Sequence, residues 1–392
     1  MHISLDSALG RQRRLNSVGE SVLQIAPNAA AAYSLRSLTG GDPRVVRVRR
    51  DTDNAEQDFT ASGISSGALV DFATSGNGVF ANTGYESFTN ASASGFTASN
   101  TGSTGFAVSD ILDGVSGDAV SVSFDIDITN GSPGLSLRTA LNGGSTASNS
   151  ATYTTSGSKT ATLTGNKSYV GIGFTEGDAP SNFTVSNFKV LGSGFVETWY
   201  DQSGNGEDAV QETSGNQPKI VSAGALVADG IDFDGSNDRL NMPNDLIASI
   251  NSASAFLVAK SDTISGSRIA LALSHSTSNF RFYAGALLGN KLNFGYQNTA
   301  VKIELGSADT NKHLFTSIAG SSNVEAFLDG TSKGTVSSVD GKSTLSSGGI
   351  GSINSGNLWS GTIEEVIVYN TDQSANRVAL ETNIQAQYPT LP

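Results

Sequence analysis

Residues 195–240 read FVETWYDQSGNGEDAVQETSGNQPKIVSAGALVADGIDFDGSNDRL. Two apolar runs in this stretch each end in a polar turn that contains glycine. The run from Phe195 to Tyr200 ends at DQSGNG, and the run from Ile231 to Phe233 ends at GSND. Short apolar runs closed by such turns are typical of β-strands. The stretch therefore predicts two strands, and working outward from it we find strand patterns on both sides.

The composition fits an all-β protein of two or three domains. The 392 residues include 45 glycines but only 15% charged residues, a balance that short strands joined by glycine-rich turns produce. A disordered chain of similar polarity would lack the 18 phenylalanines and 9 tyrosines found here, which need cores to fill.

Charge and cysteine content exclude several kinds of partner and site. The net charge of -13 repels phosphate backbones, so we expect no nucleic-acid partner. The absence of cysteine excludes disulfides and thiolate ligands, which leaves packing, oligomerisation or an oxygen-ligated cation to hold the fold together. No apolar run reaches membrane-spanning length and the start shows no secretory pattern, so we expect no membrane partner.

A first helix is predicted over residues 5–26. Its apolar positions follow a three-four-three spacing that is typical of a short coiled coil or a docking helix, and three arginines stand just ahead of them. Two interpretations stay open: the helix lies on its own domain, or it anchors the chain to a larger assembly. The residues expected to make such an anchor are Arg11, Arg13, Arg14, Leu15, Val18, Val22 and Ile25.

Residues 44–50 predict a strand with one apolar and one cationic face, and an acidic run follows it at Asp51, Asp53, Glu56 and Asp58. The simplest interpretation is that the arginines pair with these acids. The aspartate spacing also suggests calcium, but the glycine and the terminal glutamate of a helix-loop-helix calcium site are missing.

Residues 79–194 predict an inserted domain. Charge nearly vanishes there, and the period-two apolar positions of its short strands predict a two-sheet sandwich. The flanking motifs GALVDFATSGNG and FVETWYDQSGNG would form one continuous unit without it, and an exposed glycine-rich turn tolerates insertion of a whole domain. The predicted host domain comprises residues 27–78 plus 195–392, with a carbohydrate-binding-module-like sandwich between them.

The rest of the host domain predicts a second, larger antiparallel sandwich. Short strands recur at regular spacing and hairpin turns separate several of them. The last element is a predicted helix with Leu380, Ile384 and Tyr388 on one face and with Asp372 or Ser374 as its cap.

Several motifs carry a resemblance to known families. FDGSNDRL, VEAFLDG, GIGS and WSGTIEEVIVYN, followed by a terminal helix, resemble the laminin-G-like, concanavalin-type jelly roll. More narrowly, AAYSLR, VVRVRRDTDNAEQDF and TWYDQSGNGEDAVQ resemble the catalytic domain of fungal α-L-arabinofuranosidase B. The likeness covers most of the host domain and none of the insert or the first 25 residues. It implies a jelly-roll sandwich with affinity for glycans.

The same block, together with the start SALGRQRRLN, resembles tail and head fibre proteins of marine and cyanobacterial phages. That resemblance implies a protein on the outer surface of a virion, whose partners are other virion proteins and a host-surface glycan. Fibre proteins are commonly trimers, and the short heptad pattern is compatible with a homo-oligomer.

The resemblance does not extend to hydrolysis. A retaining glycosidase needs two carboxyl groups about 5 Å apart. In the arabinofuranosidase family the acid/base Asp follows the GIG motif, where this chain has Ile353, and the counterpart of the nucleophile strand, SASAFLVAKS at residues 252–261, contains no carboxylate. With both catalytic positions vacant, we expect a protein that is not an enzyme and has no catalytic residues.

Two further groups of residues are candidate sites. Asp232, Asp234 and Asp238 bracket a tight turn and are candidate calcium ligands, although turns favour aspartate for reasons of their own. Trp199 and Trp359 have the flat faces on which sugars stack, but aromatic residues in strands of this form usually fill the core.

The remaining acidic and histidine side chains have simpler interpretations. Glu364 and Glu365 alternate faces on a strand, so at most one points inward, and we expect a solvent-facing or arginine-paired glutamate. His2, His275 and His313 are too few and too scattered for a metal triad.

These observations together predict a non-catalytic phage virion surface protein, a fibre or decoration protein of the tail or head. It would anchor by its N-terminus, display two β-sandwiches for glycan or surface binding, and need no cofactor, with calcium left open as a ligand. The alternatives are a glycoside hydrolase related to arabinofuranosidases and a bacterial adhesin or lectin.

Overall fold

The structure of this protein is a computed structural model. It describes residues 20–75, 79–82, 85–100, 106–110, 119–131, 135–140, 146–148, 152–164, 171–175, 180–243, 246, 252–274, 281–296, 301–320, 323–337, 347–352 and 356–391. Several residues discussed above lie outside these ranges, namely His2, Arg11, Arg13, Arg14, Leu15, Val18, His275 and Ile353.

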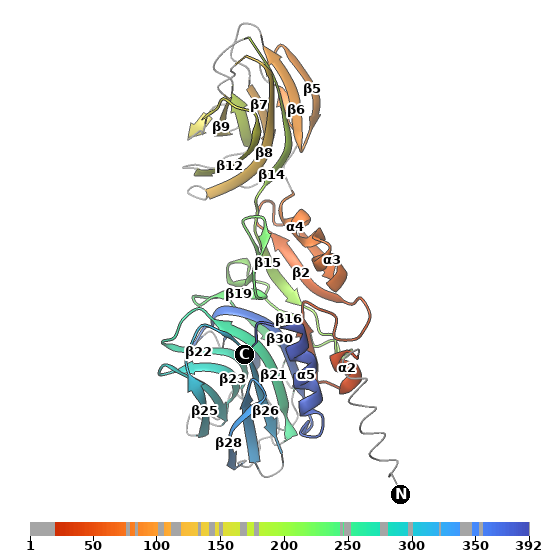
Figure 1. Ribbon diagram of the computed structural model, residues 1–392, viewed down its shortest axis with the longest axis vertical. Coiled ribbons are helices and arrows are strands. Elements are labelled where there is room, and N and C mark those ends of the chain that lie inside the picture. The colour runs from red at the N-terminus through yellow and green to blue at the C-terminus, as the bar shows by residue number, and fades with distance from the viewer. Residues whose placement is uncertain are drawn as a thin grey trace, which may run out of the picture.

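Strands between residues 81 and 190 form two antiparallel sheets, which Figure 1 shows at the end of the molecule away from α5. One sheet has the order β10-β9-β13-β7-β4, with β11 also paired to β9, and the other has the order β12-β8-β14-β6-β5. Their bounds are β4 Ala81–Asn82, β5 Ser87–Ser92, β6 Gly95–Asn100, β7 Phe106–Asp110, β8 Ala119–Asn130, β9 Leu135–Ala140, β10 Thr146–Ser148, β11 Thr152–Tyr153, β12 Gly157–Thr164, β13 Gly171–Thr175 and β14 Ser181–Val190.

These two sheets enclose a hydrophobic core of their own. Val122, Phe124 and Ile126 of β8 are buried in it, and Phe183 and Val185 of β14 pack against them. The alternation of apolar and polar residues that predicted these strands is therefore present, because one face of each sheet is buried. The exact boundaries of the insert, 79 and 194, stay a prediction.

The other strands belong to the larger sandwich, whose members run antiparallel. Their bounds are β1 Ala31–Ser34, β2 Arg44–Arg50, β3 Glu56–Thr60, β15 Gly194–Trp199, β16 Ala209–Val210, β17 Lys219–Ser222, β18 Ala225–Leu226, β19 Ile231–Asp234, β20 Leu240–Met242, β21 Ser254–Ser261, β22 Ser267–Ser274, β23 Arg281–Leu288, β24 Lys291–Tyr296, β25 Val301–Ser307, β26 Lys312–Ala319, β27 Asn323–Leu328, β28 Thr331–Ser337, β29 Ser347–Ile350 and β30 Ser360–Tyr369. The helical segments are α2 Val22–Ile25, α3 Ala61–Ser65, α4 Ala68–Ala73, η1 Ser214–Asn216 and α5 Arg377–Gln387.

Two sets of strands make the layers of this sandwich. One set runs β28-β27-β26-β21-β30, with β1 and β19 on the far side of β30, and the other runs β20-β29-β22-β23-β24-β25. Strand β16 pairs with β20 of the second set and with β15, and β15 connects through β17 to β19 of the first set, so these strands join the two sets. Leu257, Leu271 and Trp359 lie in the core between them. The predicted all-β fold with two sandwiches is confirmed.

Helices α2 and α5 cover the outer face of β21, β26 and β30, as Figure 1 shows. Leu380 and Ile384 of α5 are fully buried there against Phe256 and Ile367. The predicted cap of α5 is wrong, because the N-cap is Asn376, which makes no side-chain capping hydrogen bond. Asp372 instead accepts from the backbone N–H of Ser374 and begins the preceding turn.

Candidate functional site

A β-bulge in β30 lies at two consecutive glutamates, Glu364 and Glu365. Opposite β21, Val258 pairs with Glu365 and Ala259 pairs with Ile363, so Glu364 is the extra residue of the bulge. A bulge interrupts the alternation of side chains along a strand. The prediction that Glu364 and Glu365 alternate faces is therefore wrong, and each of them pairs with a cation.

Glu365 is buried and bound on several sides. Its side chain is 1% exposed, and Arg36 approaches it with Nε 2.7 Å from Oε2 and Nη2 2.9 Å from Oε1. The hydroxyl groups of Tyr388 and Ser34 also donate to Oε2, at 2.9 and 3.1 Å. The expected arginine-paired glutamate is confirmed at this position. Burial alone would lower the pKa of Arg36, but the Glu365 carboxylate outweighs it and raises that pKa.

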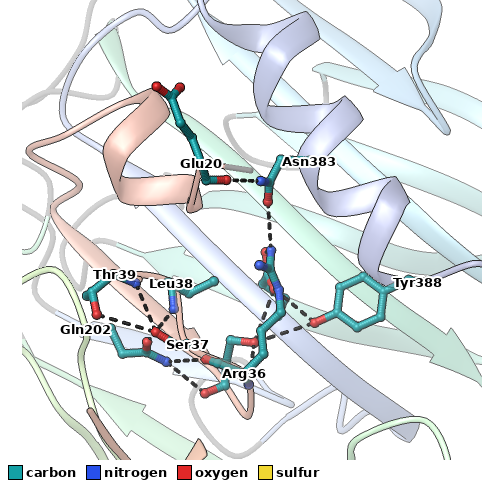
Figure 2. Close-up of polar contacts among 10 residues, drawn as sticks. Glu20, Arg36, Ser37, Leu38, Thr39, Gln202, Asn383 and Tyr388 are labelled. Atoms are coloured by element: carbon teal, nitrogen blue, oxygen red, sulfur yellow. Dashed lines mark hydrogen bonds and ion pairs between the residues drawn. The ribbon is translucent and has the colours of Figure 1, made fainter. Parts of the chain in front are cut away.

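The segment that carries Arg36 is held by the DQSGNG turn. The side-chain Nε2 of Gln202 donates to the carbonyl oxygens of Ser34 and Arg36, and its Oε1 accepts from the backbone N–H of Leu38. Figure 2 shows Gln202 beneath this segment and Asn383 of α5 above Arg36, where Asn383 accepts from Nη2 at 3.3 Å. The motif that suggested a family resemblance thus positions a charged group of the site.

Lys312 lies between two more carboxylates. Its Nζ is 2.8 Å from Oδ1 of Asp229 and 2.7 Å from Oε2 of Glu364, while Nζ of Lys260 is 3.0 Å from the other oxygen of Asp229. Lys312 chiefly lowers the pKa of Asp229, whereas burial raises the pKa of Glu364. Two neighbouring carboxyl groups therefore have pKa values displaced in opposite directions.

A glycine allows Asp229 to reach this position. Asp229 itself has φ +66°, and the following Gly230 has φ +108°. A Cβ on Gly230 would lie 2.5 Å from the carbonyl oxygen of Ile363 and 2.6 Å from Cγ of Glu364. Only glycine lets this turn approach β30 so closely, and the approach sets the carboxylate of Asp229 beside that of Glu364.

A pocket of about 770 Å³ opens over these groups. Its polar lining includes Arg36, Asp229 and Glu364, and Tyr388 also lines it. The same ring has Arg36 and Lys312 at 5.9 and 5.6 Å from its centre. The aliphatic lining is contributed by Leu35, Ala61, Ile64, Leu226 and Val227. The pocket therefore combines apolar side chains with hydrogen-bonding groups, here called its floor.

One carboxylate of the floor keeps an open acceptor. Oε2 of Glu364 is buried and lies 2.7 Å from Nζ of Lys312, which occupies it. The Glu364 side chain is 15% exposed and lines the pocket. Its other oxygen, Oε1, is therefore the one left to accept a hydrogen bond from water or from a ligand.

The aspartates considered for calcium serve the turn between β19 and β20. Oδ1 of Asp234 accepts from the backbone N–H groups of Ser236, Asn237 and Asp238, and Oδ2 of Asp238 accepts from the N–H of Asp234. Burial raises the pKa of Asp238 to about 7, and burial also raises that of Asp232. Across the described ranges, no group of three or more His, Cys, Asp or Glu side chains is placed to hold a metal ion. The calcium hypothesis gains no support.

The two tryptophans and the basic strand follow their simpler interpretations. Trp199 and Trp359 are 0% and 1% exposed, so they fill the core.

In the acidic run that follows the basic strand, Asp51 accepts from the backbone N–H of Ser193 at 3.0 Å. The predicted pairing of the basic strand with the acidic run is confirmed for three arginines. Arg44 pairs with Asp58, Arg47 with Glu56 and Asp58, and Arg50 with Asp53.

The described part of the N-terminal segment packs on its own domain. Val22 is fully buried, and Ile25 packs against the cluster that contains Leu380 and Ile384 of α5. The prediction that Val22 contacts another virion protein is wrong, because its side chain already lies in the chain's own core. This matches the first of the two interpretations of the helix.

Sequence reasoning missed Asp229, Lys312 and Arg36 as members of a site. The one visible signal was the pair Glu364-Glu365 inside an otherwise apolar strand, since buried charges need partners. Apart from this cluster, His313 is the other buried charged group of β26, and it contacts Asp309 and Asp329 at 3.0 and 2.7 Å.

None of the helices in the described ranges combines the length and the apolar character that a membrane span requires.

No protein-family model and no curated protein sequence matches the chain. Among solved structures, it is similar to domain 4 of AbnA, a GH43 extracellular arabinanase from Geobacillus stearothermophilus, with 12% identity and a TM-score of 0.33 over 44% of this chain and 80% of that one. It is also similar to a putative carbohydrate binding protein from Bacteroides ovatus, with 11% identity and a TM-score of 0.31 over 71% and 78%. The Trypanosoma rangeli sialidase aligns with 9% identity and a TM-score of 0.37 over 79% of this chain and 63% of its own. These neighbours are named as carbohydrate-binding or carbohydrate-cleaving proteins, and TM-scores this low indicate no shared function.

Proposed function

We propose that this chain is a non-catalytic, glycan-binding β-sandwich protein and that the pocket over Glu364 holds the sugar. The observation that carries the proposal is the lining of the pocket, which combines aliphatic side chains with charged groups that are ion-paired. A sugar ring has apolar C–H faces and a rim of hydroxyl groups, so it matches such a lining. Ligand pockets commonly combine apolar walls with a few placed polar groups.

The floor is better suited to binding than to hydrolysis. A general acid must carry a proton and a nucleophilic carboxylate must be free to attack. Here Lys312 contacts both Asp229 and Glu364, and Lys260 contacts Asp229 as well. Both carboxyl groups are therefore engaged by ammonium groups, and neither is free for its catalytic part. The expected vacancy at Ile353 points the same way.

Binding can be tested by blocking the pocket. Ser65 lines it, whereas the adjacent Ser66 does not, and both are exposed. We expect wild-type protein and Ser66→Trp to bind the same glycans on a microarray that includes bacterial surface polysaccharides, and Ser65→Trp to lose them. Equal binding by both variants would place the sugar elsewhere.

We further propose that the protein is displayed on the outer surface of a phage virion as a homo-oligomeric fibre or decoration protein. Support comes from the resemblance of SALGRQRRLN and the host motifs to phage fibre proteins. Cryo-electron microscopy of intact particles is the test. The proposal requires residues 5–19 to contact another virion protein, and a particle without this chain would refute it.

A glycoside hydrolase is the second candidate function, because Asp229 and Glu364 form a carboxylate pair at a pocket and have pKa values shifted apart. Release of reducing sugar from arabinan or bacterial polysaccharide would establish it. Activity of the hydrolase would have to disappear in Glu364→Gln and persist in Glu304→Gln, which removes an exposed carboxylate paired with Lys291.

A further inference from the structure

The charges beneath the pocket are balanced locally. Arg36 is committed to Glu365 through two contacts, and Lys312 is shared by Asp229 and Glu364. Lys260 supplies a second positive charge to Asp229, so three cations face the three carboxylates Glu365, Asp229 and Glu364. Arg36, Lys312 and Lys260 therefore each have a carboxylate partner within ion-pair distance, and the described residues that line the pocket include no further cation that could attract an anion.

The charge of the whole chain acts in the same direction. A net charge of -13 disfavours the approach of an anionic polymer. An acidic sugar would also have to displace Glu364 or Asp229 from Lys312, which would leave a half-buried carboxylate without its partner. Such a loss is costly. Uronates, sialic acids and phosphorylated sugars are therefore poor candidates for this pocket.

Two features specify the groups that a ligand must offer. Glu364 lines the pocket with a side chain that is 15% exposed, and Lys312 occupies its Oε2 at 2.7 Å, so the other oxygen, Oε1, is the acceptor that remains for a ligand. Leu226 lines the pocket and is 40% exposed, which makes it one of four exposed large apolar side chains among the described residues, and it offers an apolar surface to a ligand. Hydroxyl donors on one side and C–H groups on the other describe the edge and the face of a neutral sugar.

We infer that the pocket takes a neutral sugar, whose hydroxyl groups donate to Glu364 and Asp229 while one face of its ring packs on Leu226. This inference rests on the proposed glycan-binding function and narrows it to uncharged glycans. Binding would then vary little with salt, because no net charge is neutralised on association.

The test is calorimetric titration of the full chain with two panels of equal chain length. One panel contains neutral pentose and hexose oligosaccharides, and the other contains oligouronates. We expect saturable binding of at least one neutral oligosaccharide, with an affinity that changes less than about twofold when NaCl is raised from about 0.05 M to about 0.5 M. We expect no binding of the oligouronates.

Two variants locate the sugar, and each has a matched control. Glu364→Gln and Leu226→Ser should each weaken binding at least about tenfold, because one removes a charged acceptor and the other an apolar contact. Glu304→Gln and Ile264→Ser alter an exposed glutamate and an exposed apolar side chain away from the pocket and should leave affinity unchanged. Leu226 is exposed, so its replacement does not endanger folding.

The outcomes separate this inference from the function on which it rests. Salt-sensitive binding of oligouronates at the pocket, lost in Leu226→Ser, would overturn neutrality but uphold glycan binding. Neutral binding that neither Glu364→Gln nor Leu226→Ser weakens would overturn the assigned contacts. The absence of binding to every sugar of both panels would overturn the inference and the proposed function together.

Discussion

Replacing Arg36 with methionine should destabilise the larger sandwich far more than replacing a comparable surface arginine. The substitution leaves the Glu365 carboxylate, which is 1% exposed, without its cation. Breaking a buried ion pair typically costs about 3–5 kcal/mol. Ser34 and Tyr388 would still donate to Oε2, so we expect a loss near the lower limit, about 3 kcal/mol. Since small domains have about 5–15 kcal/mol of stability, this is a large fraction.

Urea unfolding followed by tryptophan fluorescence measures this loss. The sequence has two tryptophans, Trp199 and Trp359, and both lie in the core of the larger sandwich, so the signal reports that sandwich and not the insert. The matched control is Arg44→Met, which breaks an ion pair of 2.9 Å with Asp58 whose side chains are 63% and 30% exposed. Such a pair is worth at most about 1 kcal/mol.

A second variant separates the lost pair from the lost packing. Changing Arg36 and Glu365 together to methionine removes the unpaired charge, so we expect it to recover at least about 1 kcal/mol relative to Arg36→Met. If Arg36→Met costs no more than Arg44→Met at an unchanged slope against urea, then Glu365 does not depend on Arg36, and our account of the floor is incorrect.

Further predictions concern pH and the turn that carries Asp229. Burial opposes the charge of His313, but Asp329 and Asp309 outweigh it and raise its pKa. The stability that this group contributes is complete below the unfolded pKa of about 6.5 and is lost as pH rises through the higher folded pKa. The stability advantage of wild type over His313→Gln should therefore shrink as pH rises above about 6.5. Burial raises the pKa of Asp238 to about 7, so the folded state keeps a proton that the unfolded chain releases near pH 4. The thermal stability of the wild type should therefore fall as pH rises from about 4 to about 7. Asp238→Asn lacks the titrating group, so this part of the fall should be missing from its thermal melts. Gly230→Ala should strain a φ of +108° and push Asp229 from Glu364, costing at least about 1 kcal/mol and weakening sugar binding; unaltered affinity would show that Asp229 is not part of the site.

Periodicity and turn chemistry in the sequence were enough to predict most of the fold. Strands such as β8 and β14 alternate buried and exposed residues, and that pattern is local. The core positions of Trp199 and Trp359 and the pairing of the basic strand with the acidic run follow from equally local rules. The capping of α5 does not, because Asp372 serves an earlier turn.

The site could not be predicted, because it depends on contacts between distant segments. Asp229, Lys312 and Glu364 come from a loop and two strands that the fold brings together around one ammonium group. The bulge at Glu364 is set by the register of β30 on β21, which no pattern within β30 reveals. Strict alternation placed the two glutamates on opposite faces, and the bulge is the physical reason that this failed.

A crystal structure of the full chain with the neutral oligosaccharide that binds most tightly would show both the position and the chemical state of the ligand. We expect an intact sugar that packs on Leu226 and donates hydrogen bonds to Glu364. A cleaved sugar in the pocket, or an intact one bound away from these two residues, would contradict the assignment of this pocket as a non-catalytic glycan site.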